Sequence, residues 1–142
     1  MFQNLNIEDK LPSLNEFFSA LPDIQTVYLF GSYGTEYQTP DSDIDFAILF
    51  TGDMHINQEA LLLNQLSIVL DTDRVDLLNL NKAPIRLQFA AIADGRIIHE
   101  KNYIATCNYI ERVINLYQDY SITLNKFYKD YDASLREAYE DG

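Results

Sequence analysis

The sequence has few basic residues and one cysteine, and both scarcities exclude functions. Lysine and arginine number 10 against 22 aspartates and glutamates, giving a formal net charge of −12 over 142 residues. Nucleic-acid binding relies on lysine and arginine contacts to phosphates, so this composition argues against direct nucleic-acid binding and template-directed polymerisation. The alternative is that the acidity mainly serves solubility. Cys107 has no second cysteine to pair with, and its separation from His55 and His99 leaves no zinc pattern.

Long apolar runs are also missing. No segment approaches the length of a membrane span, and the first ten residues lack the basic and apolar regions of a secretory signal. We therefore expect a cytoplasmic protein without a membrane partner. Apolar residues make up 47% of the chain, which is typical of a globular protein. We expect one domain over 1–142, with a core over about 1–100 and a C-terminal helical segment over about 101–138.

Apolar periodicity and turn residues predict alternating helices and strands before that segment. Helices are expected over 7–21, 33–38, 57–70 and 81–93. Strands are expected over 25–30, 43–50, 74–80 and 96–99.

Glycine and proline are absent from Arg96 to Asp141, which predicts one long helix or two. A heptad-like stripe steps through it by four and three residues: Tyr103, Cys107, Ile110, Ile114, Tyr117, Ser121, Leu124, Tyr128, Tyr131 and Leu135. In one interpretation the first half packs on the domain's own sheet, which would also bury Cys107 as a small apolar side chain. In the other, the tyrosine-rich far half presents a surface to a partner chain.

The most informative stretch runs from Val27 to Phe50 and contains two aspartates at the start of an apolar strand. Side chains alternate along a strand, so Asp43 and Asp45 should point the same way, while Ile44 and its alternate neighbours enter the core. Two adjacent carboxylates repel each other, and a cation would compensate them. Oxygen ligands of this kind suit magnesium.

A turn before this strand adds the features of a phosphate site. Gly31 allows close backbone approach to a ligand. Ser32 offers a hydroxyl where a helix is expected to start, and free N–H groups at a helix start favour anions.

Gly31-Ser32, a ten-residue gap and Asp43-Ile44-Asp45 together resemble the signature of the DNA polymerase β-type nucleotidyltransferase superfamily. The small size resembles its minimal members (MNT), several of which are MntA-type antitoxins paired with HEPN toxins. The resemblance implies an α/β (α+β) fold, in which helices flank a small mixed β-sheet. It also implies a third acidic residue on a neighbouring strand.

Asp76 is the position that best matches this third carboxylate. It lies mid-strand between Val75 and Leu77, where a lone charge is costly unless it is paired or metal-bound. Asp71 and Asp73 are rivals, but they precede the strand, where a solvated acidic loop is the ordinary explanation.

The resemblance implies an activity as well as a site. Asp43, Asp45 and Asp76 would hold two Mg²⁺ ions, and Gly31 and Ser32 would cradle the β- and γ-phosphates of ATP. The reaction would transfer AMP to a hydroxyl, expected to be a tyrosine, of a HEPN toxin within a hetero-oligomer. The alternatives are an antitoxin that neutralises by binding alone, and a small-molecule nucleotidyltransferase of the antibiotic-modifying type.

Four further polar residues are candidates for lesser roles. Arg74 either reaches a phosphate or forms an ion pair with Asp71 or Asp73. The roles of Lys82 and Arg86 stay open. His99 ends an apolar strand, which favours a structural role.

Overall fold

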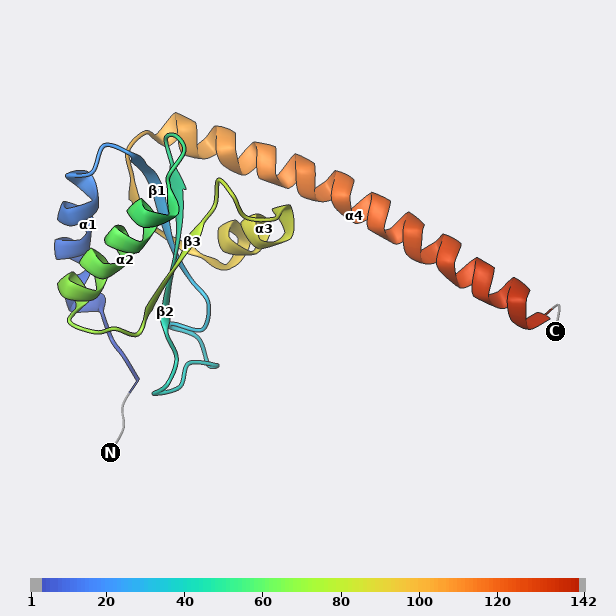
Figure 1. Ribbon diagram of the computed structural model, residues 1–142, viewed down its shortest axis with the longest axis horizontal. Coiled ribbons are helices and arrows are strands. Elements are labelled where there is room, and N and C mark those ends of the chain that lie inside the picture. Colours follow the sequence, from blue (N-terminus) through green and yellow to red (C-terminus); the bar gives the residue numbers. More distant parts are fainter. Residues whose placement is uncertain (1–3, 141–142) are drawn as a thin grey trace.

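Figure 1 shows the computed structural model of the protein, which describes residues 4–140. For Leu135 and residues 137–140 only the backbone is described. The ends of the predicted domain, residues 1–3 and 141–142, therefore lie outside the described residues, as does the side chain of Leu135. The elements are η1 (Glu8–Lys10), α1 (Leu11–Ser19), β1 (Ile24–Phe30), β2 (Ile44–Phe50), α2 (Ile56–Leu70), β3 (Val75–Asn79), α3 (Ile85–Asp94), β4 (Arg96–Glu100) and α4 (Tyr103–Glu140).

The four strands form one mixed sheet in the order β3-β2-β1-β4. Strand β1 pairs antiparallel with β2 and with β4, whereas β2 and β3 are parallel. Parallel neighbours need a crossover connection, and α2 supplies it between β2 and β3. The predicted mixed sheet flanked by helices is confirmed.

Helices cover both faces of this sheet. Helices α1 and α2 lie on one face, and α3 with the first part of α4 lies on the other (Figure 1). Alternate residues of β2 divide between the two cores. Ile44, Phe46 and Ile48 pack with the α1 and α2 side chains, as predicted, whereas Ala47 and Leu49 pack with α3 and α4. Burial on both faces explains why β1 and β2 read as almost continuous apolar runs.

Three of the predicted helices differ in the structure. Over 7–21 the 3-10 turn η1 precedes α1, which ends at Ser19. No helix forms over 33–38, where the chain makes a series of turns. The Gln38 side chain accepts a hydrogen bond from the backbone N–H of Gly34, and the Thr35 hydroxyl donates to the carbonyl of Ser32. Such side-chain bonds compete with helical ones. Helix α3 begins only at Ile85 because the residue before Pro84 is disfavoured in a helical conformation.

The C-terminal segment is one helix, α4, of 38 residues. Its near half packs on the sheet, as one of the two interpretations predicted, but through Thr106, Tyr109 and Val113. Tyr103 and Cys107 of the predicted stripe are exposed, so the expected burial of Cys107 is wrong. The prediction failed because it placed the buried face of the helix on apolar positions alone, whereas the observed buried face includes a polar residue.

Thr106 is that polar residue, and a hydrogen bond holds it against the sheet. Its hydroxyl lies 3.0 Å from that of Thr26 on β1, and both residues are buried. Apolar periodicity alone does not predict a buried contact between two threonine hydroxyls.

Helix α4 also holds α3 in place. The rings of Phe89 and Tyr117 stack with centroids 3.9 Å apart and planes 5° from parallel. The Tyr109 hydroxyl donates to Gln88 Oε1 at 2.9 Å. Beyond these contacts α4 runs away from the domain (Figure 1), and Tyr128 and Tyr131 are each 55% exposed. None of the helices described has the length and apolar character needed to cross a bilayer.

Replacing Tyr117 by alanine tests this docking of α4. We expect Tyr117→Ala to lower the free energy of unfolding by about 2 kcal/mol, because it removes apolar burial and a stacked aromatic pair. Tyr128→Ala, the same change on the exposed half, should stay within about 0.5 kcal/mol of wild type. Urea denaturation measures both, and equal losses would contradict the docking described.

Candidate active site

The site is a row of side chains across three strands on the α3 face of the sheet. Phe30 at the end of β1 pairs with Asp45 on β2, and Asp45 pairs with Asp76 on β3. Asp43 lies just before β2, which begins at Ile44 and not at Asp43 as predicted. Asp43 and Asp76 are exposed, whereas Asp45 is partly buried. The fold thus brings the three predicted aspartates together at one end of β2 and β3.

The electrostatics of this row favour a bound cation. Burial, and then the charges of Asp76 and Asp43, raise the pKa of Asp45 from 3.8 to about 6. Among the side chains that the structure describes, the ion pairs are Lys82–Glu59 and Arg96–Glu8, and neither includes one of the three aspartates. Hard carboxylate oxygens without a basic partner fit the ligand preference of Mg²⁺.

Although the three aspartates lie at the same end of β2 and β3, their carboxylates do not gather around one point. Among the described residues no three acidic, histidine or cysteine side chains lie close enough to hold a metal ion. Asp76 Oδ1 instead accepts the backbone N–H of Leu77 at 2.8 Å. The donor chemistry of the three carboxylates therefore fits a divalent cation.

Gly31 lies directly against Asp45. Its φ is +83°, and a Cβ at this position would overlap Asp45 Oδ2. Only glycine allows both the backbone angle and this close approach. Ser32 follows in the same turn, but no helix begins there, so the expected helix N-terminus at Ser32 is wrong. Any phosphate contact of this turn must come from local backbone and hydroxyl groups.

Arg74 holds the loop that carries Asp43. Its Nη2 donates to the carbonyl of Ser42 at 2.6 Å, and its own carbonyl accepts the N–H of Ile44 at 2.9 Å. The expected ion pair with Asp71 or Asp73 is absent from the described residues. The sequence did not predict this positioning contact. Its acceptor is a backbone carbonyl, which every residue has, so no side-chain pattern points to it.

Asp71 and Asp73, the alternatives to Asp76 as third carboxylate, lie outside the sheet. Asp71 ends α2 in a left-handed conformation with φ of +54°, and Asp73 is an exposed loop residue. Neither is paired with Asp45 in the sheet, whereas Asp76 is.

The remaining basic residues and His99 lie outside the row. Lys82 donates to the carbonyl of Met54 and pairs with Glu59, while Arg86 is exposed on α3. His99 is buried beside the ring of Phe18, and burial lowers its pKa. These contacts agree with a structural role for His99.

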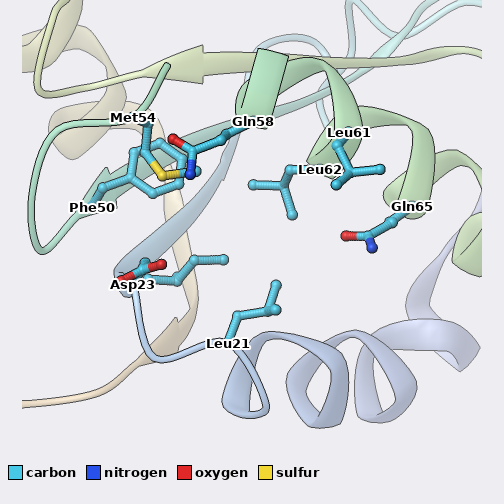
Figure 2. Close-up of a pocket in the computed structure, with 9 residues that line it drawn as sticks. Leu21, Asp23, Phe50, Met54, Gln58, Leu61, Leu62 and Gln65 are labelled. Carbon is cyan, nitrogen blue, oxygen red and sulfur yellow. The ribbon is translucent and has the colours of Figure 1, made fainter. Parts of the chain in front are cut away.

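Two hollows help to locate the site. One, of about 190 Å³, adjoins the aspartate row and is lined by Phe30, Asp45, Asp76, Leu77, Leu78 and Leu87. The other, of about 220 Å³, lies between the end of α1 and α2, where Figure 2 shows Leu21, Leu61, Leu62 and Phe50 around it. Asp23 is the single acidic residue among its lining residues, and Phe50 is at the opposite end of β2 from Asp45. The chemistry therefore favours the first hollow.

The geometry agrees with a comparison of sequences. Residues 13–104, more than half of the chain, match the family described as "Polymerase beta, Nucleotidyltransferase". The chain belongs to this nucleotidyltransferase family. The predicted family is thereby confirmed.

Individual relatives extend the comparison. The nucleotidyltransferase is 36% identical over 76 residues to the protein adenylyltransferase MntA of Shewanella oneidensis, and this stretch spans about half (54%) of each chain. It also resembles one chain of a crystal structure of a toxin–antitoxin with AMP-PNP. That match has a TM-score of 0.71 and 28% identity, and it covers 89% of this chain and 98% of the other.

A third relative supports the fold alone, because its identity is only 24%. It is one chain of a complex of tri-AMPylated Shewanella oneidensis HEPN toxin with MNT antitoxin. The TM-score is 0.70, with 88% of this chain and 98% of the other covered.

Two glycine substitutions test the contact between the turn and Asp45. Gly31 and Gly34 both have positive φ, of +83° and +75°, but an added Cβ at Gly34 meets nothing within 4 Å. We expect each alanine variant to lose about 1 kcal/mol of stability from backbone strain. Only Gly31→Ala should also weaken Mg·ATP binding, by about tenfold or 1.4 kcal/mol, because it displaces the Asp45 carboxylate. Calorimetric titration measures this, and equal weakening by Gly34→Ala would contradict it.

The raised pKa of Asp45 predicts a pH-dependent stability in metal-free buffer. The unfolded state loses this proton near pH 3.8 and the folded state near pH 6, so Asp45 destabilises the fold progressively as pH rises between these values. The shift corresponds to about 3 kcal/mol, which solvent screening of a partly exposed carboxylate reduces to about 1–2 kcal/mol.

Asp45→Asn should therefore exceed wild type in stability by about 1–2 kcal/mol at pH 7.5 and match it at pH 3.5. Asp73→Asn removes an equal charge from the exposed loop and serves as control. Urea denaturation at both pH values measures the difference, and a gain of the same size at pH 3.5 would rule out this cause.

Proposed function

We propose that the protein is a Mg²⁺-dependent nucleotidyltransferase that transfers AMP from ATP to a hydroxyl, a tyrosine, of a partner HEPN toxin, and so acts as an antitoxin. The observation that carries the proposal is the cross-strand pair of Asp45 and Asp76 beside the Gly31 turn. Family membership supports nucleotidyl transfer. The name of the MntA relative supports AMP and a protein acceptor, and the toxin–antitoxin structure with AMP-PNP supports ATP and the kind of partner.

The residues divide the work by position. Asp43 and Asp45 would hold two Mg²⁺ ions, with Asp76 joining them on one ion, and Gly31 and Ser32 would hold the β- and γ-phosphates. When bound, the metal neutralises phosphate charge and lowers the pKa of the attacking hydroxyl. That oxygen forms a bond to the α-phosphorus, the bond to the β-phosphate oxygen breaks, and pyrophosphate leaves. Asp76, on the edge strand β3, takes the hydroxyl proton.

We infer that the acceptor belongs to another chain. The nucleotidyltransferase would be a single domain over 1–142 whose C-terminal helical segment, about 101–138, extends beyond the sheet. Its catalytic row is acidic and half-exposed, so it suits a partner that brings its own hydroxyl to the metal-loaded site. ATP as substrate places the reaction in the cytoplasm.

One observation favours neutralisation by binding alone. The far half of α4 exposes apolar side chains, among them Phe127, Tyr128 and Tyr131, and such patches mark protein interfaces. An antitoxin that masks its partner needs this surface and no metal site.

Intact-mass spectrometry separates the two functions. The chain is co-expressed with the protein encoded beside it, and the purified pair is given ATP and Mg²⁺. We expect the partner's mass to rise by one or more AMP units with the wild-type protein and to stay unchanged with Asp43→Asn/Asp45→Asn, because that variant removes two metal ligands. Asp71→Asn/Asp73→Asn, a double change of equal charge in the loop before β3, should leave transfer within threefold.

Measuring toxicity in the same cells provides the result that could contradict nucleotidyl transfer. Unchanged partner mass, together with full suppression of toxicity by Asp43→Asn/Asp45→Asn, would refute nucleotidyl transfer as the mechanism and leave masking in its place.

A further inference from the structure

The hollow beside the aspartate row combines two carboxylates with apolar walls. Phe30, Asp45 and Asp76 form one cross-strand row, and the next row on the same face is Tyr28, Ala47 and Leu78. Ala47 is fully buried and does not line the hollow, which lies instead beside Asp45 and Leu78. Leu87 of α3 also lines this hollow, so that Phe30, Leu78 and Leu87 face a space of about 190 Å³.

These apolar walls are only partly buried by the protein itself. Phe30, Leu78 and Leu87 each keep intermediate exposure, although their neighbours Tyr28, Ala47 and Leu80 are buried. The hollow is open to solvent, and its volume of about 190 Å³ leaves room for a six-membered aromatic ring to cover these apolar side chains.

The position of the hollow indicates which aromatic group of the reaction it could bind, the ring of an acceptor tyrosine or the nucleobase of ATP. In a tyrosine the ring is bonded directly to the attacking oxygen, whereas the nucleobase is separated from the α-phosphorus by the whole ribose. Asp45 and Asp76 line the hollow, so its occupant lies within reach of the reacting oxygen. The leucine and phenylalanine walls also offer no side-chain donor to the ring nitrogens of a purine, which are hydrogen-bond acceptors.

We propose that this hollow receives the aromatic ring of the acceptor tyrosine, and that Phe30, Leu78 and Leu87 select tyrosine over serine and threonine. The inference rests on the proposed function and specifies its acceptor site. The phenolic oxygen lies at the mouth next to Asp76, attacks the α-phosphorus and passes its proton to Asp76, while pyrophosphate leaves. Serine and threonine reach the same oxygen position without filling the hollow, so they gain no apolar burial.

Filling the hollow tests the proposal in the complete complex with the partner. We expect Leu87→Phe to lower AMP transfer to the partner 10- to 100-fold, the range that corresponds to losing the burial of one aromatic side chain. Its dissociation constant for Mg·ATP should stay within twofold of wild type. Leu61→Phe places the same substitution in the hollow between α1 and α2, and transfer should be unaffected. Thermal unfolding of each variant establishes that it is folded.

A binding measurement on the wild-type protein needs no transfer and no variant. N-acetyl-L-tyrosinamide is titrated into protein with labelled leucine methyl groups, followed by NMR. The methyl signals of Leu78 and Leu87 should shift saturably, and those of Leu61 and Leu62 at the other hollow should not. N-acetyl-L-serinamide at the same concentrations should shift none of the four.

The outcomes separate this proposal from the proposed function. If the wild-type protein modifies its partner but Leu87→Phe transfers equally well, or if the modified residue is not aromatic, the acceptor pocket is refuted and nucleotidyl transfer stands. A loss of Mg·ATP affinity in Leu87→Phe would make the hollow a nucleobase site instead. If the wild-type protein transfers nothing, the proposed function fails, and tyrosinamide shifts at Leu61 and Leu62 alone would refute the pocket independently.

Discussion

The parallel register of β2 and β3 is the constraint on which the site depends. It sets Asp45 opposite Asp76, so that two carboxylates meet on one face of the sheet. A slip of one residue would turn Asp76 to the other face and place Val75 or Leu77 opposite Asp45. The register is specified by burial, because Ile44, Phe46 and Ile48 fill one core while Ala47 and Leu49 fill the other. The fold therefore tolerates the repulsion between carboxylates that a bound cation would relieve.

The C-terminal helix contributes to the same site through α3. The stacked rings of Phe89 and Tyr117 and the bond from Tyr109 to Gln88 fix α3 over the sheet. Helix α3 in turn carries Leu87, which lines the hollow next to the aspartates. The near half of α4 thus supports the site, and its far half is left as an exposed surface of tyrosine and other apolar residues. One element serves both stability and the proposed contact with a partner.

Most of the elements were predictable from local patterns, because alternation and turn residues act within a few positions of the chain, whereas the choice of Asp76 also used the family resemblance. The strand order was not predictable, since pairing joins residues distant in sequence, as Ile24 joins Phe50 and Thr26 joins Glu100. The helix over 33–38 was wrong because side-chain bonds to the backbone replaced helical ones. The buried face of α4 was misplaced because Thr106 reaches Thr26 by a polar contact. The contact of Arg74 was not predicted because its partner is the carbonyl of Ser42.

The central claim is that Asp43, Asp45 and Asp76 form one metal and triphosphate site with the Gly31 turn. A crystal structure with Mn²⁺ and a non-hydrolysable ATP analogue tests it most directly, because manganese favours oxygen ligands as magnesium does and gives an anomalous signal. We predict anomalous peaks within ligand distance of all three aspartates, with the β- and γ-phosphates at Gly31 and Ser32. Peaks confined to Asp71 and Asp73, or an analogue bound away from Gly31, would contradict the claim.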